Sequence, residues 1–241
     1  MKTRIKFIHW LINLNEKIIF YPKLKKFYSK HIKVEQPLII DVGSNHGQSI
    51  DFFLTINEKS KVIGFEPNKS LYEKLIKKYA SNKNISIQNM GVSNIQGELL
   101  FKENILDLTS TFESVDSNSS YLKMKANVLG IKPNELILQE YNVPVLSLSF
   151  FFKENKIKQV DVLKIDVEGH EFKCMEGLFY QTEKLPHIKY IQYEMHKDDM
   201  YASQNENKIS NLLIQNNYIE VKKIKHGFGD FYEIIYENQN N

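Results

Sequence analysis

This chain of 241 residues has little of what marks a disulfide-bonded, metal-clustered or membrane-spanning protein. Its single cysteine, Cys174, excludes both an intramolecular disulfide and a cysteine cluster for a structural metal, and it fits a reducing compartment. No apolar run approaches the roughly 18 residues that a bilayer-spanning helix needs. The hydrophobic fraction of 42% is enough for one sizeable core. We therefore expect a cytoplasmic protein with one main domain.

Charge is distributed unevenly along the chain, although the net charge is only +3. Residues 1–36 carry nine basic against two acidic residues, a balance of +7, whereas the other 205 residues carry 23 against 27, a balance of −4. This basic segment is rich in aromatic residues, and we expect it to be helical and separate from a domain over residues 37–241. It either packs beside the sheet or caps a substrate entrance, or it docks on anionic lipid at the inner face of the membrane. The acidic remainder argues against a nucleic-acid partner.

Strand patterns alternate with helical patterns from residue 37 onward, which predicts an α/β fold with a mostly parallel sheet. Residues 218–224 and 231–236 flank a short glycine-containing loop, as in an antiparallel hairpin. The stretch 105–141 is irregular and polar in its first half, and we expect it to fold over the site as a substrate lid. The remaining strands are expected at 38–42, 61–66, 85–90, 160–166 and 188–194, and the helices at 46–56, 69–80, 148–156, 169–180 and 206–216.

The most informative motif runs from Asp41 to Gly47, where an apolar strand gives way to a helix. Its two glycines permit a sharp turn and the close approach of a ligand to the main chain. The next strand ends in Glu66, whose carboxylate suits two ribose hydroxyls. The motif has no Gly-x-Gly pair to bring a pyrophosphate close, and Asp41 suits a cation better than a phosphate. S-adenosylmethionine, a sulfonium without phosphate, fits this pattern. The predicted cofactor-binding residues are Asp41, Gly43, Ser44, Asn45, Gly47, Glu66, Pro67, Asn68 and Asp166.

A second group of polar residues follows two later strands. Asp166 ends one strand and precedes Glu168, whereas Glu194 and His196 end the next strand and point to one side, because strand residues alternate. We expect all four at the carboxyl edge of the sheet, facing the transferable methyl group. The predicted catalytic residues are Asp166, Glu194 and His196. Glu194 or His196 takes the proton of an acceptor hydroxyl, and Asp166 and Glu168 orient the acceptor or the cofactor. A variant in which these four residues hold Mg²⁺ or another oxygen-preferring ion stays open.

The order and spacing of these motifs resemble the FkbM family of S-adenosylmethionine-dependent methyltransferases over roughly residues 37–200. The matching segments are the Asp41–Gly47 loop, Phe65-Glu66-Pro67, Lys164–Glu171 and the strand that ends in Glu194 and His196. The resemblance implies a Rossmann-like class I methyltransferase fold, with a mostly parallel seven-stranded sheet and a C-terminal antiparallel hairpin. It also implies O-methylation of a hydroxyl of a sugar, a glycan precursor or a related metabolite, as in polysaccharide biosynthesis.

Two other classes of function compete with this interpretation. One is a nicotinamide-dependent oxidoreductase, and the missing Gly-x-Gly pair argues against it. The other is a non-catalytic Rossmann-like module that docks at a membrane surface or in a glycan-assembly complex. The intact Asp41, Glu66 and Asp166 argue against loss of the cofactor site. The sequence does not determine the acceptor or the oligomeric state.

Overall fold

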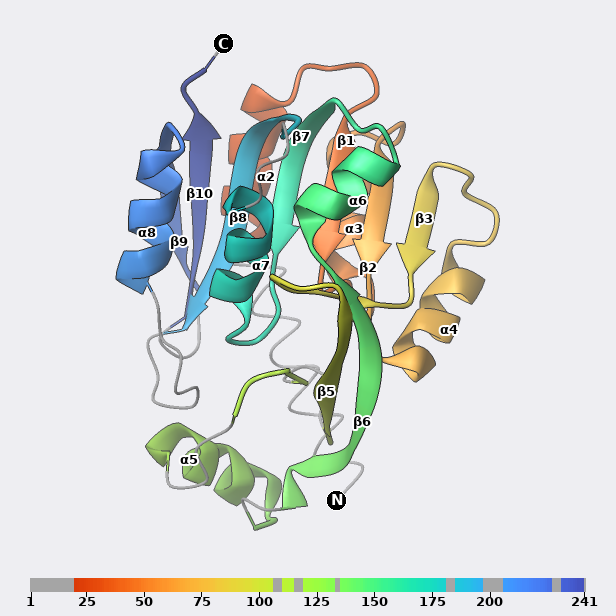
Figure 1. Cartoon of the computed structure of the whole chain (residues 1–241), viewed down its shortest axis with the longest axis vertical. Helices are drawn as coiled ribbons and strands as arrows, with labels where there is room; N and C mark the ends of the chain where they lie inside the picture. Colours follow the sequence, from red (N-terminus) through yellow and green to blue (C-terminus); the bar gives the residue numbers. More distant parts are fainter. Residues whose placement is uncertain are drawn as a thin grey trace.

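The centre of the protein is a seven-stranded sheet, seen in the computed structural model of the chain (Figure 1). The strands lie in the order β3-β2-β1-β7-β8-β10-β9, and the pairs among the first five are parallel. Only β10 is reversed, because it pairs antiparallel with both β8 and β9. The predicted mostly parallel sheet with a C-terminal hairpin is confirmed. Its strands are β1 (Leu38–Val42), β2 (Lys61–Phe65), β3 (Ile85–Gln88), β7 (Gln159–Ile165), β8 (His187–His196), β9 (Tyr218–Lys225) and β10 (Phe231–Asn238).

The structure describes residues 20–105, 110–114, 119–132, 135–180, 185–196, 206–226 and 231–240. Residues 1–19, which make up half of the predicted basic segment, lie outside these ranges. So does part of the predicted lid.

Helices cover both faces of the sheet, as expected for parallel strands that are buried on each side (Figure 1). One layer holds α6 (Leu148–Glu154), α7 (Glu171–Phe179) and α8 (Glu206–Gln215), which share a hydrophobic cluster with the sheet. The other holds α2 (Tyr21–His31), α3 (Gln48–Ile56) and α4 (Lys69–Lys78), which share a second cluster. Asn68 caps α4, because its side chain accepts a hydrogen bond from Leu71 N, as the sequence indicates.

Helix α2 belongs to the predicted basic segment, and its apolar side is part of the core. Phe20, Leu24 and Tyr28 are buried there, and the Tyr28 hydroxyl donates a 2.6 Å hydrogen bond to Gln192 Oε1 in β8. These three apolar side chains pack into the core. The opposite, exposed side of the helix consists mostly of lysines. The exposed lysines of this region are Lys23, Lys25, Lys26, Lys30 and Lys33.

A second, three-stranded sheet flanks the stretch 105–141 that was expected to be an irregular lid, and the start of β6 (Ile137–Leu146) lies within that stretch. The sheet has the order β4-β6-β5, with β4 (Gly91–Val92) and β5 (Gly97–Asn104), and α5 (Ser120–Leu129) lies between β5 and β6. We call residues 97–146 the arm. It extends beyond the carboxyl edge of the main sheet, with α5 at its far end (Figure 1). The expectation was wrong for residues 137–141 at the start of β6, which are all exposed or only partly buried, so no buried run marks the strand there.

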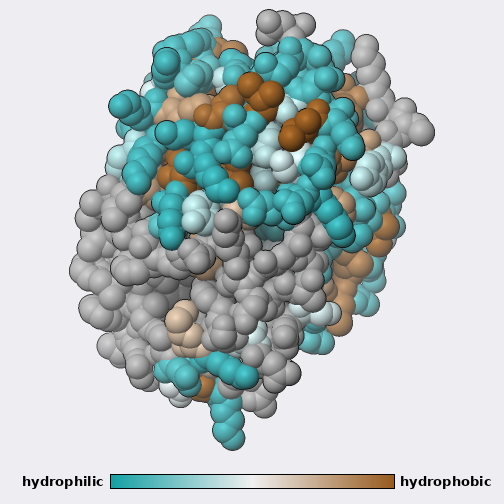
Figure 2. Space-filling view, turned by 90° about the vertical axis from the view of Figure 1, so that its left-hand side faces the viewer, coloured by the Kyte–Doolittle hydropathy of each residue, from teal (hydrophilic) through white to brown (hydrophobic). Residues whose placement is uncertain are grey.

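Helices in the described ranges are all too short or too polar to cross a membrane. Figure 2 views the side that carries α8 and β9, where the described surface is mostly hydrophilic with small hydrophobic spots. Lys222, Lys223 and Lys225 are exposed on β9, the edge strand. Lysines on an edge strand discourage pairing with another sheet.

Candidate active site

Three predicted carboxylates lie on neighbouring strands at one edge of the sheet. Val42 at the end of β1 is in register with Phe65 of β2 on one side and with Ile165 of β7 on the other. Beyond the paired residues, Asp166 N donates to Val42 O at 3.0 Å. Asp41, Glu66 and Asp166 therefore come from adjacent strands at the same carboxyl edge, which is where open α/β sheets bind their ligands.

The two glycines of the β1–α3 loop both have positive φ angles, as the predicted sharp turn requires. Gly43 has a φ of 85° and Gly47 a φ of 81°. The space of a side chain is taken by protein atoms in both cases. A Cβ on Gly43 would lie 1.8 Å from Asp166 O, and one on Gly47 would lie 2.4 Å from the Tyr79 hydroxyl. These glycines serve the close packing of β1 against β7 and of the loop against α4.

Asp41 lies just behind the rim and not on its surface. Its side chain is fully buried, and both carboxylate oxygens accept hydrogen bonds from the Ser49 hydroxyl, at 2.7 and 2.8 Å. Burial raises the pKa of the carboxyl group, while Lys164 and the Ser49 hydrogen bond act in the opposite direction. The Ser44 hydroxyl is also buried and donates to the backbone carbonyl of Asp41 at 3.1 Å. These two side chains shape the loop from beneath.

Glu66 connects the two loops that the sequence assigned to the cofactor. Its Oε2 accepts from Asn45 N at 2.7 Å, and its Oε1 accepts from Asn68 N at 2.8 Å. Asn45 itself is held with a φ of 48°, and Pro67, between Glu66 and Asn68 in the chain, is partly buried. The Asn68 side-chain amide nitrogen is buried and has no acceptor among the described residues. A buried donor of this kind is costly unless a ligand or water satisfies it.

Three carboxylates converge at the ends of β7 and β8, and we call Asp166, Glu168 and Glu194 the acidic cluster. One oxygen from each lies within 4.8 Å of the other two, and all three residues are partly buried. Glu168 reaches this position through a left-handed turn with a φ of 54°. Glu171 stabilises the turn, because its carboxylate accepts from Val167 N at 3.1 Å and from Gly169 N at 3.2 Å.

Lys164 lies beneath the acidic cluster and is a residue to which the sequence interpretation gave no role. Its buried ammonium donates a 2.8 Å hydrogen bond to Asp166 Oδ2. Burial alone would lower the pKa of this lysine, but the carboxylates of Asp166, Glu233 and Asp41 outweigh burial and raise the pKa well above its ordinary value. Lys164 is therefore a fixed positive charge that favours the ionised form of Asp166. A lysine within a buried strand is the sequence signal that indicates such a role.

The histidine described beside Glu194 is His226, near the end of β9. His226 Nε2 lies 3.7 Å from Glu194 Oε1, and both side chains are largely buried. The imidazole stacks on Phe20 with ring centroids 4.3 Å apart. The sequence placed His226 only in a hairpin loop. The predicted histidine, His196, ends β8, but its side chain lies outside the described residues.

Comparison with known proteins identifies the family. The family model for the FkbM methyltransferase domain matches residues 41–234. The chain belongs to the FkbM methyltransferase family. A curated relative, the hexuronic acid methyltransferase AglP of Haloferax volcanii, is 24% identical over 163 residues. That match covers 67% of this chain but only 57% of AglP, so the chain spans little more than half of the relative's length.

One solved structure supports the fold, and a second is a weaker match. A candidate rRNA methylase from Clostridium thermocellum aligns with a TM-score of 0.51 at 10% identity, over 91% of this chain and 95% of that one. A SAM-dependent methyltransferase from Aquifex aeolicus aligns with a TM-score of 0.48 at 12% identity, over 97% of each chain. At such identity the first alignment shows the fold alone. The family match and the first alignment together support a methyltransferase fold for this chain.

Proposed function

We propose that this FkbM methyltransferase transfers the methyl group to a hydroxyl of a sugar, a glycan precursor or a related metabolite, as a step of polysaccharide biosynthesis. The observation that carries the proposal is the acidic cluster, whose three oxygens lie within 4.8 Å of one another beside the predicted cofactor loop. A neutral hydroxyl can donate hydrogen bonds to such a cluster, whereas an anionic acceptor atom would be repelled by it. The name of AglP supports a sugar as the acceptor.

The residues along this edge of the sheet fit S-adenosylmethionine. When bound, it supplies a methyl group on a positively charged sulfur, and a rim of carboxylates favours that charge. We assign its binding to the loop of Gly43, Ser44, Asn45 and Gly47, to Glu66, Pro67 and Asn68, and to the carboxylate of Asp166. Asp41 belongs to the same site but acts from beneath the loop, where its buried carboxylate is held by Ser49. The buried Asn68 amide, which has no acceptor among the described residues, supports a ligand at this edge.

Glu194 is our candidate for the base that takes the proton of the acceptor hydroxyl, with His196 as the other candidate that the sequence left open. Glu194 is only partly buried and has oxygens within 4.8 Å of both Asp166 and Glu168. Asp166, which pairs with Lys164 at 2.8 Å, and Glu168 would accept hydrogen bonds from the acceptor or the cofactor. A base of this kind contributes typically a hundredfold or more to rate.

The test is methyl transfer from radiolabelled S-adenosylmethionine to a panel of nucleotide-linked hexoses and hexuronic acids. We expect labelled product with wild type, and a loss of about a hundredfold in Glu194→Gln and in Asp166→Asn. Glu73→Gln, an exposed carboxylate on α4, is the matched control and should keep full activity. If Glu194→Gln and a variant of His196 together leave the rate unchanged, the base assignment is wrong.

Two simpler measurements separate the remaining alternatives. S-adenosylhomocysteine at about a hundred times its dissociation constant should raise the melting temperature by several degrees. Absence of any shift would favour the non-catalytic module. Chelation with EDTA separates direct base catalysis from the metal variant, because only an activity that needs a divalent ion at the acidic cluster would be lost.

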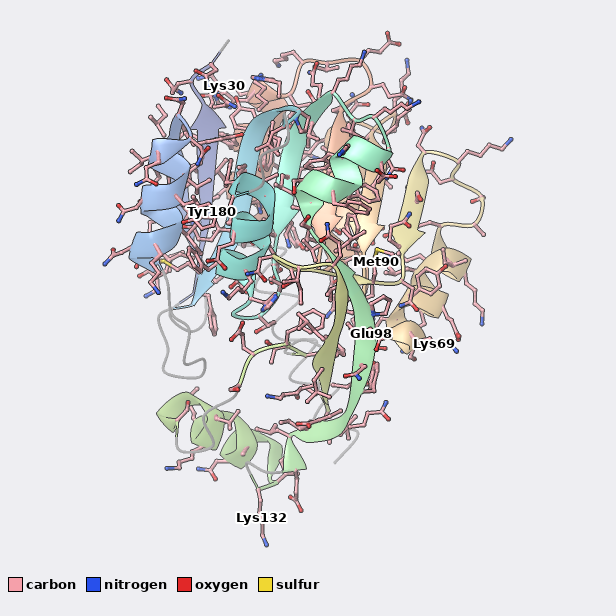
Figure 3. All side chains as sticks on the ribbon, in the orientation of Figure 1. Lys30, Lys69, Met90, Glu98, Lys132 and Tyr180 are labelled. Atoms are coloured by element: carbon pink, nitrogen blue, oxygen red, sulfur yellow. The ribbon has the colours of Figure 1, made fainter. Side chains whose placement is uncertain are left out.

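We also propose that this cytoplasmic enzyme contacts an anionic membrane surface through residues 1–36. The exposed lysines of α2 support this contact, and Lys30 lies at the end of the molecule opposite Lys132 on the arm (Figure 3). Such a contact would leave the arm free. The fraction of protein that co-sediments with phosphatidylserine vesicles should fall several-fold in the triple variant Lys23→Glu, Lys26→Glu, Lys30→Glu. Reversal of Lys69, Lys74 and Lys77 on α4 is the control, and an equal fall in both variants would refute the assignment.

A further inference from the structure

A short segment of the arm, residues 110–114, rests on the loop that carries Glu168. Thr111 Oγ1 donates a 2.7 Å hydrogen bond to the backbone carbonyl of Glu168. Glu113 Oε1 lies 2.7 Å from His170 Nδ1, and the rings of Phe112 and His170 lie 5.2 Å apart. We propose that Thr111 and Glu113 are positioning residues that form a clasp, which holds the Glu168 carboxylate in the acidic cluster. This inference rests on the proposed function of that cluster.

Glu168 needs such support because its backbone conformation is unfavourable. A non-glycine residue with a positive φ persists only where its surroundings hold it there. Glu171 stabilises the residues on either side, Val167 and Gly169, from within the main domain. Thr111 holds Glu168 itself, and it does so from the arm. The threonine side chain is 1% exposed, so the hydrogen bond is protected from water.

The second contact of the clasp is anchored in the main domain. His170 is buried, and its Nε2 lies 2.9 Å from Ser93 Oγ, just after β4. The row Glu113, His170, Ser93 has the composition of a hydrolase triad, but Ser93 is 1% exposed and cannot meet a substrate. The row is therefore a structural connection. Glu113 ties the arm to the start of α7 through His170, and Ser93 holds the other side of the imidazole.

The clasp is also rigidly joined to the rest of the arm. Lys102 of β5 and Thr111 exchange two backbone hydrogen bonds, at 2.9 and 3.1 Å. Lys102 Nζ donates to Glu113 O at 3.0 Å, and Glu113 N donates to Thr111 Oγ1 at 3.0 Å. A displacement of β5 by a bound acceptor would therefore reach Glu168 through a short chain of hydrogen bonds. The arm thus sets the geometry of the acceptor side without lending its own carboxylate to the acidic cluster.

The test compares Thr111→Val with Thr111→Ser in the full chain. Valine keeps the shape and removes the hydrogen bonds, whereas serine keeps the donor and the acceptor. We expect amide hydrogen exchange over residues 166–170 to become roughly fivefold faster in Thr111→Val, the factor expected for one lost hydrogen bond. Thr111→Ser should stay close to wild type. Equal exchange in the two variants would overturn the clasp. If Thr111→Val does not fold, Glu113→Ala replaces it with the same expected change.

Catalysis provides the second readout. With the nucleotide-linked sugar that wild type methylates, Thr111→Val should lower kcat about tenfold and leave the affinity for S-adenosylhomocysteine within about twofold, and Thr111→Ser should restore kcat. Equal kcat in both variants would overturn the positioning role even if exchange differed. Should wild type methylate none of the sugars, the proposed function fails, whereas the exchange comparison still decides whether the clasp exists.

Discussion

Gly43 is the position where the addition of a single methyl group should destabilise the folded protein most. Its Cβ would lie 1.8 Å from the backbone oxygen of Asp166, where real contacts do not fall below about 3 Å. Rotation of this carbonyl is restrained, because Val167 N, which belongs to the same peptide unit, donates a 3.1 Å hydrogen bond to Glu171 Oε1. The left-handed backbone adds about 1 kcal/mol for any side chain, and displacement of a packed backbone adds roughly 1–3 kcal/mol or more.

We therefore expect Gly43→Ala to lose about 3–4 kcal/mol of the free energy of unfolding, a shift of roughly 10 °C in melting temperature. The chain offers a matched control in Gly97, which also has a positive φ but has no atom within 4 Å of the position that a Cβ would take. Gly97→Ala should lose only the backbone strain of its φ of 145°, roughly 1–3 kcal/mol. Urea unfolding followed by circular dichroism measures both. If the two variants unfold at the same urea concentration, the close approach of β1 to β7 is not what requires glycine here.

Buried groups give three further predictions. Ser49→Ala leaves the Asp41 carboxylate without its hydroxyl donor and should cost about 1–3 kcal/mol by urea unfolding; an unchanged midpoint would contradict the buried pairing. Cys174 is fully buried and burial raises the pKa of its thiol, so Ellman's reagent should label it only after denaturation; fast labelling of native protein would show an open site. Burial likewise raises the native pKa of Tyr28 well above 10, so its contribution to stability is complete below pH 10 and falls as the pH rises further, by about 1.4 kcal/mol per pH unit. Urea midpoints at pH 8 and pH 11 should differ less in Tyr28→Phe than in wild type, and an equal difference would refute this.

The strands and the ligand edge were readable from the sequence because local pattern determines them. Buried parallel strands require apolar runs, and the turn from β1 into α3 requires positive φ angles that glycine adopts most easily. The acids that follow the strands could therefore be placed at one edge from the order of the elements alone, and Asp166 and Glu66 lie there. The sequence also indicated that Asp41 was near this edge, but not that its carboxylate is turned inward to Ser49.

Contacts between distant segments were decided by the tertiary structure. Lys164, Glu233 and Asp41 come from three different strands. Only the packed sheet shows that the buried lysine interacts electrostatically with both carboxylates. The arm was hidden because β5 pairs with β6 across more than thirty intervening residues, and the pairing of Thr111 with Glu168 spans 57 residues. Periodicity along the chain reports which residues are buried. Which buried groups meet depends on the crossovers of the chain, and these are selected by the packing of the whole core.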